Sequence, residues 1–316
     1  MNSIAIETRH LARRLGQHQA VSDVSLSVPE GSVYALLGRN GSGKTTTLKM
    51  LLGLLRADRG SIRILGCDPQ RERLRTARLT GALLEAHGFY TQLTGAENLD
   101  IARRLLGLGE GEIARVLRLT GLDERAARLR VGGYSLGMRQ RLGIARALLG
   151  APRLLILDEP GNGLDPDGIA DMRRFLRTLP ERTGATVMIS SHQLSEVEQT
   201  ATHVGVIHDG RLVVEGPLAT LKSAAAPELR IATSDDTRAC QIAERMGYQI
   251  IAGAEPVLLR EPASRGGAEA RAGLNRHLVE AGIDVFLLQP GSASLESIYR
   301  HATGQDAPAI PLERVA

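Results

Sequence analysis

The chain has 316 residues, of which 43% are hydrophobic and 23% charged, the ordinary balance of a globular protein with room for one large and one small domain. A net charge of +4, 3% aromatic residues and no Trp argue against a base-stacking nucleic-acid platform, and the scattered arginines indicate solvated helix faces. Cys67 and Cys240 stand far apart without disulfide-framework or zinc-ligand spacing, so we expect a reducing cytosol.

Strand-like and helix-like segments alternate along the first two thirds of the chain. Short β-branched or apolar runs predict strands, and longer runs with apolar residues at three- and four-residue spacing predict helices. We expect strands at 24–28, 32–37, 61–65, 154–157 and 185–189, a helix at 45–55, mostly helical structure over 95–150, and a hairpin of 204–208 with 211–215 around Asp209-Gly210. This alternation is typical of an α/β fold with a largely parallel sheet.

A composition shift near 222–228, with an Ala run and Pro227, marks the end of the large domain. Beyond it we expect strands at 228–233, 249–252, 256–260 and 283–289 and helices at 236–246 and 268–281. That order predicts a small C-terminal α+β accessory domain built in two layers. The predicted division is therefore 1–224 for the large domain, 228–303 for the accessory or regulatory domain, and 304–316 for a flexible tail.

No stretch of the sequence approaches the roughly 20 apolar residues that a helix needs to cross a bilayer. The most apolar stretches, 48–55 and 148–157, are interrupted by Lys49 and by Pro152 and Arg153. The first 14 residues carry charge throughout and lack the apolar core of a signal peptide. We therefore expect neither a membrane span nor a signal peptide.

The strongest motif is a glycine-rich loop that follows a predicted strand and precedes a predicted helix. It fits the pattern G-x-x-x-x-G-K-[S/T] and consists of Gly38, Arg39, Asn40, Gly41, Ser42, Gly43, Lys44 and Thr45, followed by Thr46. Glycines let the backbone wrap phosphates closely, so that N–H groups and the helix N-terminus face the negative charge. We expect Lys44 to reach the β- and γ-phosphates and Thr45 to ligate Mg²⁺.

A second motif is an apolar strand, 154–157, that ends in two carboxylates. Asp158 is expected to hold the water shell of Mg²⁺, and Glu159 is expected to act as the general base that polarises the attacking water. Together the two motifs predict a P-loop nucleotidase. A GTPase would need an NKxD motif to read its base, and the sequence contains none.

Three further motifs decide the class of nucleotidase. Residues 134–141, YSLGMRQR, lie shortly before the 154–157 strand and resemble the signature motif of ABC transporters, whose usual form is LSGGQ. Residues 161–165, GNGLD, resemble the D-loop of that family, and residues 189–192, ISSH, resemble its H-loop switch. The order and spacing of all motifs over residues 4–221 are similar to those of an ABC ATP-binding cassette. The resemblance implies a P-loop NTPase cassette with a helical signature subdomain.

The resemblance also implies a mechanism and a set of partners. ATP would sit on the Lys44 loop, where His192 would hydrogen-bond its γ-phosphate. Ser135 and Gly137 of a second cassette would cover that phosphate, and Asp165 would couple the two sites. The family pattern therefore implies an ATPase that acts as a homodimer, or as a pair with a second cassette. It would lie peripherally at the cytoplasmic face of the cell membrane beneath a separate integral permease, with no nucleic-acid partner.

Several residues depart from the common pattern of the family. The signature carries Leu136 in place of its first Gly and Met138 in place of Gln. Glu85 stands where most cassettes have a Gln, and a carboxylate there would ligate Mg²⁺ more strongly and act beside the attacking water; the alternative is that Glu85 faces solvent. Glu85, the phrase LTGAENL at 93–99 and the YSLGM signature resemble the bacitracin-resistance and lantibiotic-immunity exporters. That resemblance implies export of an antimicrobial peptide, an antibiotic or a similar compound.

Leu15 stands where the family usually has an aromatic residue that stacks on adenine. We expect nucleotide binding to be weaker by about 1 kcal/mol for want of that stacking. Two other functions stay open on the sequence: an importer cassette, which has the same motifs, and a soluble ABC-type ATPase that is not linked to transport.

Overall fold

The computed structural model describes residues 3–84, 88–224, 228–252, 256–262, 267–291 and 294–303. The chain divides into two compact units, Met1–Leu218 and Ala219–Ala316, and each is considered by itself. Glu85 lies outside the described residues, so its expected role as a Mg²⁺ ligand stays a prediction. Within the described part of the chain, no helix is both long and apolar enough to cross a membrane.

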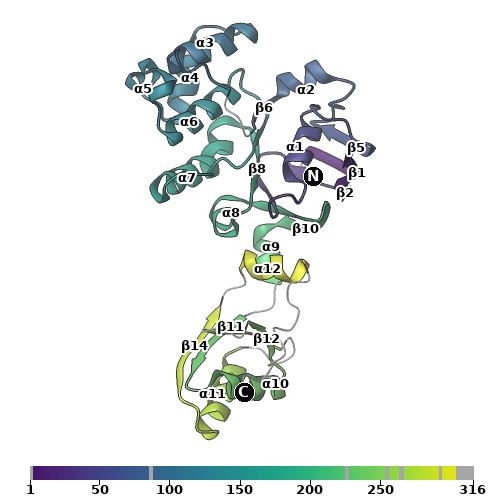
Figure 1. Ribbon diagram of the computed structural model, residues 1–316, viewed down its shortest axis with the longest axis vertical. Helices are drawn as coiled ribbons and strands as arrows, with labels where there is room; N and C mark the ends of the chain where they lie inside the picture. Colours follow the sequence, from purple (N-terminus) through teal and green to yellow (C-terminus); the bar gives the residue numbers. More distant parts are fainter. Residues whose placement is uncertain are drawn as a thin grey trace. The chain divides into compact units, whose positions relative to one another are not determined.

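A curled ten-stranded sheet runs through the first unit (Figure 1). Its order is β3-β1-β2-β10-β9-β4-β8-β7-β6, with β5 paired to β1. The strands are β1 Ile4–Leu15, β2 His18–Val24, β3 Ser27–Pro29, β4 Val33–Leu37, β5 Arg59–Ile64, β6 Thr80–Leu83, β7 Leu154–Leu157, β8 Thr186–Ser191, β9 His203–His208 and β10 Arg211–Pro217. Strands β9, β4, β8, β7 and β6 are parallel, whereas β1 pairs antiparallel with β2, β3 and β5.

The parallel strands are buried from end to end in β4, β7 and β8, as expected where both faces of a sheet are covered. The α/β fold with a largely parallel central sheet is therefore confirmed. The hairpin around Asp209-Gly210 is also present, since β9 and β10 pair antiparallel and both turn residues have positive φ, 46° and 72°. Such a turn matches the twist of the strands it joins, which explains the DG dipeptide.

The expected strand at 24–28 is wrong, because the chain there changes partners. Strand β2 ends at Val24, and β3 begins at Ser27 on the other side of β1. The Thr8 hydroxyl holds this crossing, since it donates to Val24 O at 2.9 Å and accepts from Leu26 N–H at 2.7 Å. A hydrophobic run cannot reveal such a break, because the polar group that stabilises it lies 16 residues earlier.

Four of the described helices of the first unit form a group of their own. The described helices of this unit are α1 Lys44–Leu51, α2 Arg73–Leu79, α3 Gly95–Leu105, α4 Gly111–Thr120, α5 Glu124–Arg128, α6 Leu136–Ala147, α7 Pro166–Thr183 and α8 Leu194–Thr200, with a 3-10 turn at Val131–Gly133. Helices α3 to α6 pack on one another away from the antiparallel strands and form the expected helical subdomain (Figure 1). Helix α1 buries Leu48, Met50 and Leu51 within the curl of the sheet. This packing fixes the glycine-rich loop that precedes α1.

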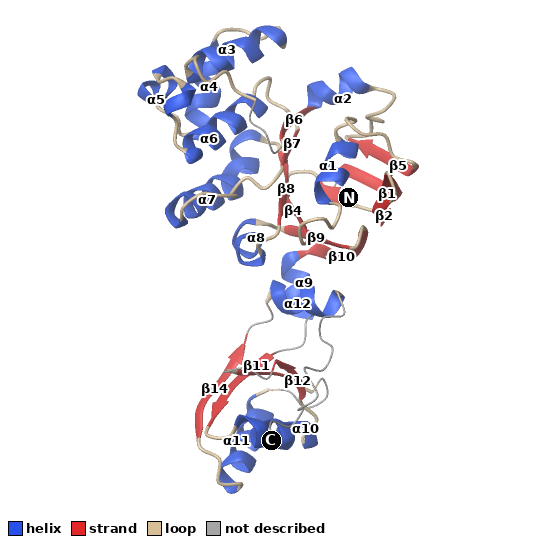
Figure 2. Cartoon of the chain, in the orientation of Figure 1, coloured by secondary structure: helices blue, strands red, loops and turns tan. Residues whose placement is uncertain are grey.

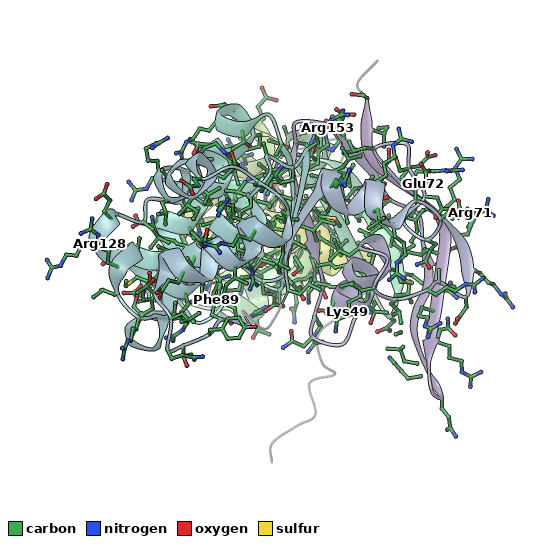
Figure 3. All side chains as sticks on the ribbon, turned by 90° about the horizontal axis from the view of Figure 1, so that it is seen from above. Lys49, Arg71, Glu72, Phe89, Arg128 and Arg153 are labelled. Carbon is green, nitrogen blue, oxygen red and sulfur yellow. The ribbon has the colours of Figure 1, made fainter. Side chains whose placement is uncertain are left out.

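Charged side chains cover separate parts of the first unit's surface (Figure 3). Arg71, Arg128 and Arg153 project outward at different places, and each lies beside a carboxylate. The partners are Asp68 at 3.7 Å, Glu124 at 3.6 Å and Glu30 at 2.9 Å. Exposed pairs of this kind contribute little to stability, so these arginines are explained as solvated surface charge.

The second unit is an α+β structure (Figure 2). Strands β11 Glu228–Thr233, β12 Gln249–Ala252, β13 Val257–Arg260 and β14 Val285–Gly291 form an antiparallel sheet of order β12-β13-β11-β14, and the helices are α9 Leu218–Ala224, α10 Asp236–Arg245, α11 Ala268–Glu280 and α12 Leu295–Ala302. Helices α10 and α11 cover one face of the sheet, and Leu229, Ile231, Leu259 and Leu274 are fully buried there. The predicted elements of this region are present; the predicted accessory role and the boundaries at 224 and 228 stay predictions.

Candidate functional site

A cavity of about 600 Å³ opens in the first unit where the two phosphate motifs meet. It lies between the β1–β2 turn, the start of α1 and the end of β7. Its lining includes Leu15, His18, Asn40, Gly41, Gly43, Lys44, Thr45, Thr46, Leu84, Leu136, Gln140, Asp158, Glu159 and Asn162. Most of the residues expected to bind nucleotide therefore face one space.

The glycine-rich loop needs its glycines for two physical reasons. Gly41 and Gly43 have φ of 81° and 104°, a conformation that side chains strongly disfavour. A Cβ at Gly43 would lie 2.4 Å from Ala20 O, and one at Gly38 would lie 2.5 Å from Ile207 O. The loop thus packs against two strands while it aims the N-terminus of α1 at the cavity, where the helix dipole favours an anion.

Lys44 is buried within this loop. Its ammonium donates to Gly38 O at 2.8 Å and to Arg39 O at 3.2 Å, and it lies 3.6 Å from Glu159 Oε1. Ser42 Oγ is also buried and has no hydrogen-bond partner among the described residues. A buried cation and an unpaired hydroxyl at the N-terminus of α1 form a suitable receptor for phosphate oxygens.

Thr45 and Asp158 meet across 113 residues of sequence. Thr45 Oγ1 donates to Asp158 Oδ2 at 2.9 Å, so a hydroxyl and a carboxylate lie side by side next to Lys44. Hard oxygen ligands of this kind, few in number and beside a phosphate site, are what Mg²⁺ takes in nucleotidases. These two residues therefore fit the ion.

Ser190, at the end of β8, holds the two carboxylate residues in place. Its Oγ donates to Asp158 Oδ1 and accepts from Glu159 N–H, the latter at 2.9 Å. Ser190 belongs to the ISSH motif at 189–192, and the motif alone assigns it no role. The signal that could have found it is a hydroxyl residue at the end of a buried strand, since the carboxyl ends of neighbouring parallel strands meet at one edge of the sheet.

Glu159 has φ of 46°, a conformation that is uncommon for residues other than Gly. Its Oε2 lies 3.0 Å from His192 Nδ1, and its other oxygen faces Lys44. Strained backbone of this kind persists where the surrounding structure fixes it, and it clusters at functional sites. Here it turns the carboxylate toward both the phosphate receptor and the histidine.

Ser135, Gly137 and Asp165 do not line the cavity of their own chain. Ser135 begins α6, where its Oγ accepts from Met138 N–H at 3.2 Å, and Asp165 begins α7, where its Oδ1 accepts from Gly168 N–H at 3.0 Å. Both side chains thus act as helix N-caps here. The structure brings together Lys44, Thr45, Asp158, Glu159 and His192 and leaves Ser135, Gly137 and Asp165 outside, although Leu136 of the signature and Asn162 of the D-loop line the cavity.

Glu196 on α8 lies behind the pair of Glu159 and His192, and sequence reasoning missed it. The three line a second, small cavity of about 30 Å³. Burial raises the pKa of the Glu196 carboxyl, Arg173 and His192 oppose that rise, and Glu159 adds to it. Glu196 follows His192 by only four residues, and the second cavity shows that α8 places it with the pair.

The residues that follow the Glu85 segment are anchored on the helical subdomain. The Asn98 side chain accepts from Tyr90 N–H at 2.9 Å and donates to Tyr90 O at 3.0 Å, and the Arg146 guanidinium lies 4.7 Å from the centroid of the Phe89 ring (Phe89 is labelled in Figure 3). Burial lowers the pKa of Arg146. The described residues before this segment thus belong to the sheet and line the phosphate cavity, and those after it contact the helical subdomain.

Comparisons with known proteins agree with this geometry. A family model described as ABC transporter matches residues 21–162. The bacitracin transport ATP-binding protein BcrA of Bacillus licheniformis is 40% identical over 302 residues, which cover 94% of this chain and 96% of that protein. The lantibiotic transport ATP-binding protein SrtF of Streptococcus pyogenes is 40% identical over 210 residues, 66% of this chain and 90% of that protein.

Solved structures show the same fold. The structure of an ATP-binding subunit of an ABC transporter is 31% identical and superposes with a TM-score of 0.61 over 69% of this chain and 92% of that one. The fold, the assembled phosphate site and the nearly full-length match to a relative point to one family. The chain belongs to the ATP-binding subunits of ABC transporters, which bind ATP and hydrolyse it to power transport.

Proposed function

We propose that this subunit powers the export of an antimicrobial peptide, an antibiotic or a similar compound through a separate membrane permease. The observation that carries the proposal is the 40% identity to a bacitracin transport protein over 96% of that protein's length. The similarity extends through the second unit, beyond the motifs that all cassettes share. The cargo itself is recognised by the permease, so the ATP-binding chain supports the class of compound and not its identity.

In the proposed site, the loop from Gly38 to Thr46 holds the phosphates and Leu15 packs on adenine. Thr45 and Asp158 hold Mg²⁺, with Glu85 as a further ligand. When bound, the ion neutralises charge that develops on the phosphates during transfer. The short distance between Thr45 Oγ1 and Asp158 Oδ2, 2.9 Å, supports this assignment.

Glu159 acts as the general base in this proposal. Its carboxylate takes a proton from the attacking water, and His192 fixes the carboxylate by its contact at 3.0 Å. Lys44, 3.6 Å from the other carboxylate oxygen, leaves its loop carbonyls to bind phosphate. The base thus lies between His192, which orients it, and the phosphate receptor, beside which the attacking water would stand.

The proposed working unit is a dimer. Ser135, Gly137 and Asp165 lie outside the cavity of their own chain, and Ser135 and Asp165 are exposed. In a head-to-tail pair, the signature would cover the γ-phosphate of the partner chain, and Asp165 would couple the two sites. The pair would lie at the cytoplasmic face of the membrane, bound peripherally to the permease.

We also propose that residues 1–224 form the cassette and that residues 228–303 form an accessory domain for dimer contact or regulation. The separate hydrophobic core of the second unit, which includes Leu229, Ile231 and Leu278, supports an independent folding unit. The described part of this unit has no counterpart of the phosphate site.

The first test is affinity purification of the chain from detergent-solubilised native membranes. We expect a multi-span integral protein at stoichiometric yield. Recovery on ribosomes or DNA without a membrane protein would contradict the transport proposal and favour a soluble ABC-type ATPase.

The direction of transport is tested in inside-out vesicles that contain the ATP-binding chain together with its permease. With ATP outside, an exporter accumulates labelled bacitracin in the lumen, and an importer does not. Lys44→Ala should abolish uptake because it removes the buried cation of the phosphate receptor. Lys49→Ala, in the last turn of the same helix and away from the cavity lining, is the matched control and should transport normally.

A further inference from the structure

Two leucines of the first unit each pack against a glycine that is adjacent in sequence to the other leucine. Leu136, in the signature, has its Cδ2 2.9 Å from where a Cβ of Gly163 would stand. Leu164, in the D-loop, has its Cδ2 3.7 Å from where a Cβ of Gly137 would stand. Leu136 and Gly137 are adjacent in the chain, as are Gly163 and Leu164. Each leucine packs in the space beside the glycine of the other pair. We call these four residues the Leu–Gly interlock.

The interlock joins the beginnings of two helices. Leu136 is the first residue of α6, and Leu164 directly precedes Asp165, the N-cap of α7. Gly163 has φ of 76°, so glycine is required there for the backbone as well as for the contact. Leu136 and Leu164 are both half-buried. The contact is therefore apolar, close and specific to these two segments.

The position of Leu136 gives the contact its significance. The usual signature of the family has glycine there, and glycine has no side chain that could reach Gly163. Leu136 also lines the phosphate cavity of its own chain, whereas Ser135 and Gly137 on either side of it do not. The leucine therefore lies between the signature, the D-loop and the nucleotide site of one chain.

We propose that Leu136 is a positioning residue that makes the signature and the D-loop of one chain move as a unit. When Ser135 and Gly137 engage the phosphate of a partner's nucleotide, the interlock carries that displacement to Asp165 of the same chain. The proposal rests on the proposed dimer, in which the signature acts on the partner's site. It adds a path by which occupancy of one site reaches the D-loop.

A double-mutant cycle tests the interlock. The ATPase kcat of the full-length chain is measured for wild type, Leu136→Ala, Leu164→Ala and the double variant. If the two leucines act as one unit, each single variant loses about fivefold in kcat and the double variant loses about the same, because coupled residues are not additive. A double variant whose loss equals the product of the single losses overturns the proposal.

Controls separate positioning from damage to the fold. Titration with a fluorescent ATP analogue should give wild-type affinity for Leu164→Ala, because Leu164 lies outside the cavity lining, so the effect of this variant falls on kcat and not on binding. Leu136→Met, which keeps an apolar side chain of similar length, should recover at least half of the wild-type kcat. Leu136→Gly, which restores the usual signature residue, should be as slow as Leu136→Ala; a rate at or above wild type refutes the interlock. Leu105→Ala, on the exposed face of α3, should show no coupling to Leu136→Ala.

Failure of the dimer and failure of the interlock give different results. Glu159→Gln with Leu136 intact should form a dimer with ATP, measured by light scattering. If that dimer is absent, the proposed dimeric function fails. If it forms while the Leu136–Leu164 cycle is additive, only the interlock fails.

Discussion

The Oε2 atom of Glu159 lies 3.0 Å from Nδ1 of His192, and the Glu159 backbone adopts φ of 46° to place it there. The contact joins the end of β7 to the end of β8, two neighbouring parallel strands. Because these strands end at the same edge of the sheet, residues 33 positions apart in sequence share one site. The carboxylate is thus held at the cavity.

Glu159→Gln should bind ATP as wild type does but lose most of its turnover. The amide keeps the shape of the side chain and removes its ability to accept a proton, and loss of a general base typically lowers rates by about 10² to 10⁴. Steady-state phosphate release and fluorescent-nucleotide titration together check this. Hydrolysis at the wild-type rate would show that another group is the base.

Ser190→Ala should lower both stability and activity. Its hydroxyl joins Asp158 Oδ1 to Glu159 N–H in a buried environment, so removal leaves two buried polar groups unpaired, at a cost of about 1–3 kcal/mol. We expect a lower melting temperature and weaker dependence of ADP binding on Mg²⁺. Ser61→Ala, at an exposed position of β5, is the control. A Ser190→Ala variant with the same melting temperature as Ser61→Ala would contradict the assigned role.

Local motifs account for what the sequence predicted well. The glycine-rich loop, the Asp158–Glu159 strand end and the Asp209-Gly210 hairpin each depend on residues close together in the chain, so pattern and backbone chemistry identify them. The strands and helices of the second unit follow for the same reason, since each carries its own periodic apolar residues.

Contacts between distant segments account for what the sequence did not predict. Strand β6 has only four residues and forms by parallel pairing with β7, more than 70 residues later. Ser190 gains its role only because β8 lies beside β7 in the sheet, and Leu136 gains its role only because α6 begins next to the D-loop. Such neighbours depend on tertiary packing, which a single sequence does not display.

Leu15→Tyr should tighten nucleotide binding. Leu15 lies at the cavity beside His18, its cross-strand neighbour at the β1–β2 turn, and 43% of its surface is exposed, so a larger ring has room there. An aromatic ring on adenine is worth about 1 kcal/mol, or roughly fivefold in dissociation constant. Titration with a fluorescent ATP analogue measures this. Equal affinities would show that adenine does not pack at Leu15.

Glu215→Gln should change how stability depends on pH. Burial raises the pKa of the Glu215 carboxyl, although Ser27 N–H and Tyr34 OH both donate to its Oε1 at 2.8 Å. A carboxyl with a raised pKa binds its proton more tightly when folded. The stability that it contributes is therefore present below its unfolded pKa, about 4.3, and is lost as the pH rises through the folded value.

The amide of Gln keeps an Oε1 acceptor for both donors and cannot ionise. The melting temperature of Glu215→Gln relative to wild type should therefore increase as the pH rises above about 4.3, as wild type loses this contribution and the variant does not. Thermal melts at several pH values measure the difference, and Glu124→Gln, whose side chain is 91% exposed, supplies the baseline. A constant difference across that range would mean that Glu215 ionises as easily in the folded chain as in the unfolded one, despite its burial against Tyr34.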